Sequence, residues 1–506
     1  MAVESIAAPQ GTALGGYWGR DGMALAECAP CLEAELTARV VYLSSSPGNA
    51  VVIAALDLPG ICSDTAASLQ TELAAAAVAS GAPSNVDVLV CCTHTHTAPQ
   101  THRGLLGMGH ADDGYVSFMR AAACAAAQAA VEAAVPALVR HVRAPRQRKL
   151  AVNRRQRKGA ADQPADLPWF EKAGETVMGQ RPEGPIVDHA DALSFLKADD
   201  GSSVIGTLCC FACHPVCCGP ALEQSADYVG ACRARVEAET AGAPAVFITG
   251  ACGDINPWTQ GEGHAAAATM GSALGASIAA ALSDAVASGR PASAALVSSL
   301  SETLALPLDP LPTEQEALAF LEEARALESH AIVQEAAAVG LRTAVRETAA
   351  VRGWAEERLG LARGEGGALE ETMPLRVHGV RVGEVAILGI AGEPFSEYAL
   401  ALERASPFGN TIVAGYTDGV QSYLPTEAEC RLGGYEVCHA FKVFGLHRAP
   451  APSSEQVIMR GALGVLTALA SVAPAIVAPR RAHEAEALPE WRIPPWTGWS
   501  EETERD

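Results

Sequence analysis

Short apolar runs, rich in β-branched residues, alternate along the chain with longer alanine-rich stretches. Runs of the first kind are typical of buried strands, and stretches of the second kind are typical of helices. Their alternation predicts an α/β fold, a mixed sheet flanked by helices with a site at the strand ends. The expected strands are 35–43, 50–56, 86–92, 191–197, 204–210, 245–249, 377–390 (two strands) and 410–414, and the expected helices are 68–80, 115–137, 225–240, 264–286 and 454–469.

The region 313–359 differs from the rest because it is long, highly charged and helical in pattern. It predicts an αα-hairpin, broken near Gly340 and inserted into the main fold. Residues 159–187 are rich in glycine, proline and charge, and predict a long loop. Glycines 271 and 275 predict close packing of the helix at 264–286, and Ser225 is expected to cap the helix that follows it.

Three of the predicted strands end in a residue that can bind a metal, with a proline close behind. His94 and His96 follow the run 86–92, His214 follows 204–210, and Glu393 follows 377–390. Residues i and i+2 of an extended chain point to the same face, so His94 and His96 should project together. Two histidines and a carboxylate, with an open position for water, form a hydrolytic zinc site. Ordinary histidines satisfied by backbone and a glutamate in an exposed turn are the alternatives.

Other residues of the chain carry weaker signals. Asp57 follows a strand and is either a site carboxylate or a turn residue before Pro59. The small residues of 250–257 let backbone approach a ligand or form a plain turn. The basic stretch 140–158 predicts a largely solvated surface, in which one arginine serves an anionic or carbonyl group of a substrate.

Composition limits the partners and the compartment. The 506 residues carry a net charge of −22, which argues against nucleic acid as a partner. The amino terminus lacks the pattern of a signal peptide, and the apolar stretch 461–478 is interrupted, so we expect a cytoplasmic chain without a transmembrane segment. The fifteen cysteines are expected to be reduced, with the lone Cys28–Cys31 pair structural. Nothing in the sequence predicts the oligomeric state.

Taken together, the motifs resemble the catalytic, amidohydrolase domain of the neutral ceramidase family. The resemblance extends over roughly residues 10–450 and rests on the order and spacing of short pieces, each weak alone. These are Thr93-His94-Thr95-His96-Thr97-Ala98-Pro99, Asn153-Arg154, Phe211-Ala212-Cys213-His214-Pro215, Gly253-Asp254-Ile255-Asn256-Pro257, Gly392-Glu393-Pro394-Phe395, and Tyr423 with Tyr435-Glu436.

The resemblance implies a zinc ion and a set of site residues. The implied zinc ligands are His94, His214, Glu393 and Tyr423, although Tyr423 can instead donate to an oxyanion. His96 is then the proton-handling histidine, and Arg154 contacts the substrate or the tetrahedral intermediate. Asp254 is also assigned to the substrate. The resemblance further implies a catalytic domain over residues 1–478, with the helical insertion within it, and a tail over 479–506.

Two departures from the family pattern bear on the reaction. Asn256 stands where the ceramidases carry a serine, and an asparagine can orient water or a carbonyl but cannot be a nucleophile. The chain after Leu469 is also too short for the carboxyl-terminal β-sandwich of the true ceramidases. We therefore predict a zinc-dependent hydrolase that uses zinc-activated water on an amide of a lipid or small molecule. A zinc ester or phosphoester hydrolase and a non-catalytic scaffold are the alternatives.

Overall fold

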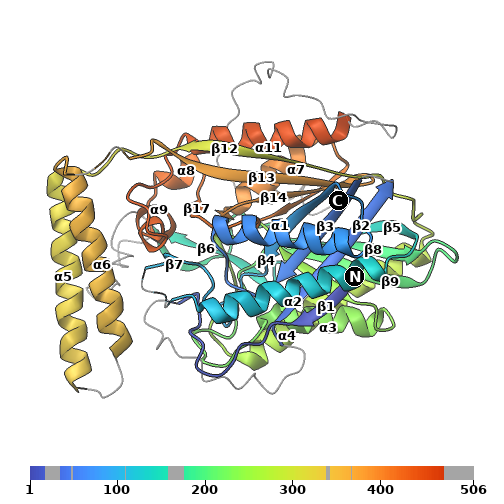
Figure 1. Ribbon diagram of the computed structural model, residues 1–506, viewed down its shortest axis with the longest axis horizontal. Helices are drawn as coiled ribbons and strands as arrows, with labels where there is room; N and C mark the ends of the chain where they lie inside the picture. The colour runs from blue at the N-terminus through green and yellow to red at the C-terminus, as the bar shows by residue number, and fades with distance from the viewer. Residues whose placement is uncertain are drawn as a thin grey trace.

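The structure is a computed structural model that describes residues 1–17, 35–46, 49–106, 108, 110–157, 176–337, 342–365, 367 and 369–471. Three four-stranded sheets, each covered by helices, make up its body (Figure 1). The first sheet has the order β1 (Ala2–Ser5), β2 (Thr37–Ser46), β3 (Asn49–Leu56), β4 (Val86–Cys92), in which β3 and β4 are parallel. Helices α1 (Ser63–Ala79) and α2 (Asp113–Glu132) pack against it.

The second sheet has the order β10 (Ala245–Thr249), β9 (Val204–Phe211), β8 (Ala190–Lys197), β5 (Ala137–Ala144), and its parallel pair is β9 with β10. Helices α3 (Asp227–Glu239) and α4 (His264–Ala287) pack together beside it. A smaller sheet joins β11 (Ile255–Pro257), β6 (Ala151–Arg157) and β7 (Thr176–Arg181). Every cysteine that the structure describes is a free thiol, as the sequence predicts.

The third sheet has the order β12 (Val297–Pro307), β13 (Thr372–Val382), β14 (Val385–Ile390), β16 (Asn410–Ala414), with β14 parallel to β16. Helix α11 (Ser454–Ser471) packs on β12 and β13, and α7 (Ser396–Ala405) on β16. Two short strands, β15 (Glu393–Pro394) and β17 (Tyr423–Leu424), pair beyond the end of β14. The short helices α8 (Glu427–Cys430), α9 (Tyr435–Cys438) and α10 (Ala440–Val443) follow.

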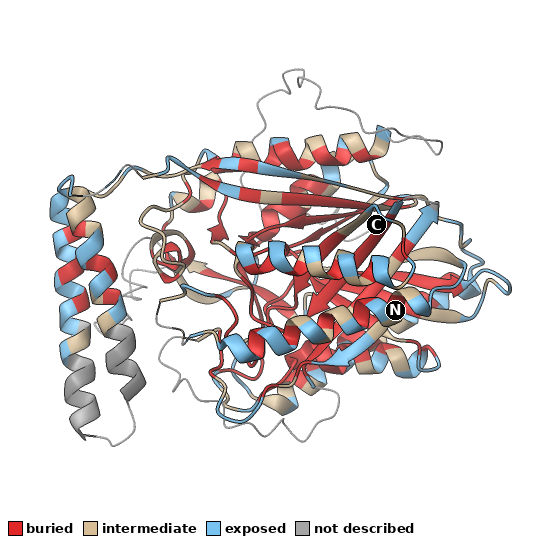
Figure 2. Cartoon of the chain, viewed as in Figure 1, coloured by how far each residue is buried: buried red, intermediate tan, exposed pale blue. Residues whose placement is uncertain are grey.

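The three large sheets share one apolar core between them. Side chains alternate between the two faces of a strand, so Val51 and Ile53 of β3 enter this shared core while Val52 and Ala54 face the helices. Each of the other two sheets contributes in the same way, for example through Leu208 of β9. Figure 2 shows the consequence: the central strands, such as β3, β9 and β14, are buried along most of their length, and the helices are exposed on their outer sides.

Helices α5 (Glu314–Ala337) and α6 (Arg342–Ala362) form the predicted αα-hairpin, which projects from one end of the molecule (Figure 1). A small apolar cluster that includes Phe320 of α5 and Trp354 of α6 holds them together at the base. Phe441 of α10 belongs to the same cluster, so the hairpin packs against the segment that follows β17. The predicted break near Gly340 and the tail 479–506 lie outside the described residues.

The structure corrects several predicted boundaries. Helix α2 stops at Glu132, because Pro136 cannot continue a helix, and β5 begins at Ala137 within the expected helix 115–137. The basic stretch forms β5 and β6, and the expected loop 159–187 contains β7. The N-cap of α3 is Ala226 rather than Ser225, although the Ser225 hydroxyl accepts a hydrogen bond from the Asp227 amide.

Helix α4 is long and apolar enough, by length and composition alone, to span a membrane, and it is the one such helix among the described residues. Its Met270, Leu274 and Ile278 are buried in the core. Gly271 and Gly275 bring α4 against the backbone of α3, as their positions predict. This is the packing of a helix that covers a sheet.

Candidate metal site

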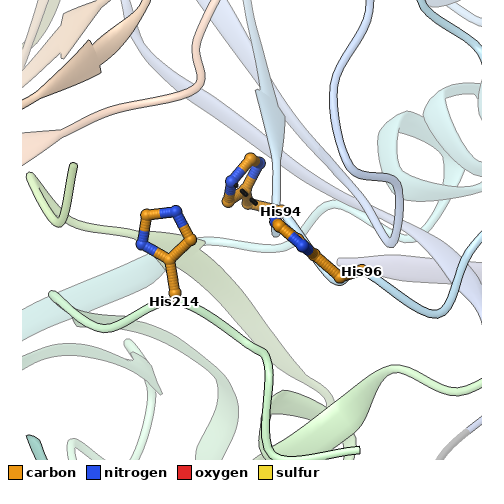
Figure 3. A group of neighbouring side chains, drawn as sticks. All are labelled: His94, His96 and His214. Atoms are coloured by element: carbon orange, nitrogen blue, oxygen red, sulfur yellow. Dashed lines mark hydrogen bonds between the residues drawn. The ribbon is translucent and has the colours of Figure 1, made fainter. Parts of the chain in front are cut away.

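The carboxyl ends of the parallel strands converge on one group of side chains. His94 follows β4, His214 follows β9, Glu393 follows β14, and Tyr416 follows β16. One ring nitrogen from each of His94, His96 and His214 lies within 4.8 Å of the other two, a group that can hold a metal ion (Figure 3). In open α/β sheets, ligands bind at the carboxyl ends of the strands, and this site obeys that rule.

His94 is fixed by its backbone and by two neighbours. Its φ of 66° turns the chain sharply at the end of β4. Its Nδ1 donates a hydrogen bond to the carbonyl oxygen of Pro59, and its ring stacks on Tyr416 with the centroids 3.9 Å apart. Burial lowers the pKa of His94 to about 3. The ring is therefore neutral at pH 7, with Nδ1 protonated and the lone pair of Nε2 directed into the group.

His214 is fully buried and is held in the same tautomer. Its Nδ1 lies 2.7 Å from the carbonyl oxygen of Cys252 and 3.1 Å from that of Ile255, both of which can only accept. Burial, with the nearby Arg154 guanidinium, holds the pKa of His214 well below its usual value. Neutral imidazoles that are anchored through Nδ1 to a carbonyl and unprotonated at Nε2 are the form in which histidine binds a metal. Both residues thus fit an ion.

Glu393 completes the group with a carboxylate. Its Oε2 lies 3.5 Å from Nε2 of His94 and 3.4 Å from Nε2 of His214, and it accepts a hydrogen bond from the Tyr416 hydroxyl at 3.3 Å. Burial raises the pKa of this carboxyl group. The parallel pair β15–β17 places Glu393 directly opposite Tyr423, so the two predicted ligands are neighbours.

His96 stands at the open side of the group. Its Nε2 lies 3.1 Å from Nε2 of His94, and because His94 Nε2 is unprotonated, His96 Nε2 is the donor. The ring is half-buried and lines the cavity next to the group. His96 can therefore be a third nitrogen ligand or a proton carrier beside an ion.

Arg154 lies against the group and is almost completely buried. Its guanidinium donates to the Tyr423 hydroxyl at 3.0 Å and to Asn256 Oδ1 at 3.2 Å, and its Nη1 lies 3.2 Å from His214 Nε2. Glu436 accepts from Arg154 at 2.8 Å and from Arg155 at 2.7 Å, so one carboxylate holds two buried guanidiniums. Although burial raises it, the two guanidiniums hold the pKa of Glu436 below its usual value.

Two acidic residues that the sequence brought forward bond to the surrounding protein, and neither is among the described residues that line the cavities. Asp254 accepts hydrogen bonds from the Asn153 side chain and from the amide and hydroxyl of Ser396, and burial raises its pKa to about 6. It lies directly before β11, the strand that carries Asn256, and ties this part of the chain to Asn153 and Ser396. Asp57 is buried and forms a bidentate ion pair with Arg233, so its carboxylate does not stand in an exposed turn.

A cavity of about 250 Å³ opens beside the group, and a smaller one of about 60 Å³ adjoins it. His96, Tyr423 and Tyr435 line both. Arg154 and Asn256 line the larger cavity, whereas His94 and Glu393 line the smaller one. Asn256 also donates to Gln260 Oε1 at 2.7 Å, which fixes its amide so that the oxygen faces Arg154. A ligand that extends through both cavities can thus contact His94, Glu393 and Arg154 at once.

Comparisons with known proteins bear on the fold that carries this group. No protein-family model and no curated protein matched the sequence. Two solved structures match it over 95% of its length: a neutral ceramidase from Pseudomonas aeruginosa, with a TM-score of 0.62 and 16% identity, and a ceramidase complexed with C2, with a TM-score of 0.63 and 14% identity. In each case 76% of the other chain is covered. The chain has the neutral ceramidase fold. The match confirms the family resemblance and the predicted α/β class, and at this identity it shows the fold alone.

Within the ceramidase fold, the structure brings the predicted His94, His96, His214, Glu393, Tyr423, Arg154 and Asn256 into one place. Sequence reasoning missed the role of Tyr416, which stacks on His94 and bonds to Glu393. The backbone conformation of Tyr416, with a positive φ of 56°, directs its side chain toward the group. The sequence gives no signal of this conformation, because Tyr416 is an isolated tyrosine in a loop.

Proposed function

We propose that the protein is a zinc-dependent hydrolase that cleaves an amide bond in a small molecule or lipid. The observation that carries the proposal is the convergence of two neutral imidazoles, His94 and His214, on the Glu393 carboxylate, with His94 and Glu393 lining a cavity. His94, His214 and Glu393 would hold the ion, with Tyr423 as the fourth protein ligand. When bound, zinc supplies a Lewis acid and a water molecule whose pKa is lowered to about 7.

The residues around the ion have separate tasks in this proposal. The Arg154 guanidinium, kept in place by Glu436, donates to the carbonyl oxygen of the substrate, where negative charge develops. Asn256 has no nucleophilic group, and its amide orients Arg154 and the scissile group. His96 carries the proton from the attacking water to the leaving amine, because it lines the cavity at the edge of the group.

The fold shared with two ceramidases favours an amide as the bond that is cleaved. The experiment that tests the proposal compares single variants in metal content and in turnover. His94→Ala and His214→Ala should lose zinc and all activity, whereas His96→Ala should keep zinc and lose at least a hundredfold in kcat. Loss of zinc in His96→Ala would make His96 a ligand instead of the proton carrier.

Substrate panels decide between the hydrolytic alternatives. A panel of N-acyl amides should show turnover that matched carboxylic and phosphate esters do not exceed. Turnover of esters alone would replace the amide proposal with an esterase. No turnover in either panel by a zinc-loaded protein would favour a scaffold that retains the fold.

A further inference from the structure

We propose that the cavity beside the metal-binding group accepts a compact apolar acyl chain of up to about eight carbons, so that the substrate class is short-chain N-acyl amides. The inference rests on the proposed amide hydrolysis and narrows its substrate. It follows from the character of the cavity walls, the volume they enclose and the packing behind one of them.

The walls of the larger cavity divide by chemistry. His96, Arg154 and Tyr423 form the side next to the metal-binding group. Met108, Met178, Val216 and Val443 form an apolar side, and polar side chains that include Asn256 and Gln260 complete the lining. No aspartate or glutamate is among its described lining residues. The reacting carbonyl therefore belongs at the first side, and the second side suits an alkyl chain.

The volume sets the length of that chain. A water-sized group occupies about 30 Å³, so a cavity of about 250 Å³ holds roughly eight such groups. The adjoining cavity of about 60 Å³ adds space for about two more, beside His94 and Glu393. A chain of sixteen carbons exceeds the space in these two cavities together, so its far end would extend beyond them.

The wall formed by α10 is supported from behind by the inserted hairpin. Val443 and His439, at the two ends of this short helix, line the cavity. Phe441, between them, packs into the apolar cluster with Phe320 and Trp354 of the hairpin. The Lys442 ammonium lies 4.0 Å from the centre of the Phe320 ring, a cation–π contact. Movement of this wall to admit a longer chain would break these contacts, so the hairpin acts as the limit on chain length.

Binding of straight-chain carboxylates, the acyl products of the proposed reaction, tests the inference without turnover. Calorimetric titration of the zinc-loaded protein would use chains from four to fourteen carbons. Affinity should rise about three- to fourfold with each methylene as far as about eight carbons and then level off. A continued rise to fourteen carbons, or no binding at any length, would overturn the inference.

Variants of the α10 wall and of the hairpin behind it make the test specific. Val443→Ala should move the plateau to longer chains by one or two carbons, and Val443→Phe should move it to shorter ones. Val465→Ala, a buried valine of α11 outside the cavity, is the matched control and should leave the plateau in place. Phe320→Ala should also lengthen the accepted chain, whereas Leu318→Ala, exposed on the same helix, should not. An unchanged plateau in both Val443 variants would contradict the proposal.

Failure of the inference is distinguishable from failure of the proposed function. A zinc-binding protein that hydrolyses amides of all chain lengths equally retains its proposed function and loses this substrate class. A protein that shows the plateau in carboxylate binding yet cleaves no amide retains the cavity assignment and loses the proposed reaction.

Discussion

At the scale of single residues, the site depends on carbonyl oxygens that fix the tautomer of each histidine. Pro59 and Cys252 each accept from an Nδ1, which leaves both Nε2 lone pairs directed at the same point. Neither carbonyl is recognisable in the sequence, because any residue can supply one. His94 itself was predictable, since it directly follows a buried strand that ends before a proline.

Glu436 gives a residue-scale prediction about stability. Glu436→Gln should lower the free energy of unfolding by roughly 3–5 kcal/mol, because Arg154 and Arg155 would lose their shared buried carboxylate. Urea unfolding measures the change. Glu427→Gln is the control: its partner Arg431 is largely exposed, and the loss should be at most about 1 kcal/mol. Equal losses of unfolding free energy in the two variants would show that the buried ion pairs of Glu436 contribute no more to stability than the exposed pair of Glu427.

At the scale of elements, close packing of α3 and α4 depends on glycine. A Cβ at Gly271 would collide with the backbone oxygen of Tyr228, whereas a Cβ at Gly353 of α6 would meet nothing within 4 Å. Gly271→Ala should therefore cost about 1–3 kcal/mol of stability, and Gly353→Ala should be neutral or stabilising by about 0.5–1 kcal/mol. Thermal or denaturant unfolding of both variants measures this. A stabilising Gly271→Ala would contradict the packing described.

Some of the helices and strands were predictable from the sequence, and others were not. The apolar strands and the hairpin were predictable from composition and length. Strands β5 and β6 were not, because their arginines resemble a solvated surface until the partners of Arg155 are known. Those partners, Glu429 and Glu436, lie more than 270 residues away in the chain. A local sequence pattern cannot predict an ion pair between residues that lie far apart in the chain.

At the scale of the whole molecule, one buried histidine links two of the sheets. His378 of β13 bonds through Nδ1 to Asp418 at 2.8 Å and through Nε2 to Asp87 of β4 at 3.2 Å, and Arg376 also contacts Asp418 at 3.1 Å. Burial alone would lower the pKa of His378, but the bonds to Asp418 and Asp87 raise it to about 9. The folded protein therefore holds this imidazole charged at neutral pH.

This link predicts a pH dependence of stability. Because the pKa of His378 is higher in the folded than in the unfolded chain, its contribution is fully present below about pH 6.5 and is lost as the pH rises through about 9. His378→Gln should therefore cost roughly 2–3 kcal/mol more near pH 6 than near pH 10. Urea unfolding at both values measures the difference, and an equal cost at both would contradict a charged His378.

The arrangement of the three sheets was the least predictable feature at this scale. Alternation of apolar residues predicts that Val51 and Val52 face opposite sides, but it does not say that Leu208 and Ile387 from other sheets share one core with Val51. That pairing depends on non-local contacts, and so does the convergence of the three strand ends on one site. The prolines after His214 and Glu393 marked the individual strand ends in the sequence. Only the packing of the sheets against one another brings these strand ends together.

The most direct test of the account is the zinc content of the purified protein. We expect close to one zinc per chain by elemental mass spectrometry, retained through dialysis. The His214→Ala variant should lose it, whereas His378→Gln, a buried histidine away from the site, should keep it. A wild-type protein that carries no zinc and takes up none from solution would contradict the proposed hydrolase and leave only the ceramidase fold.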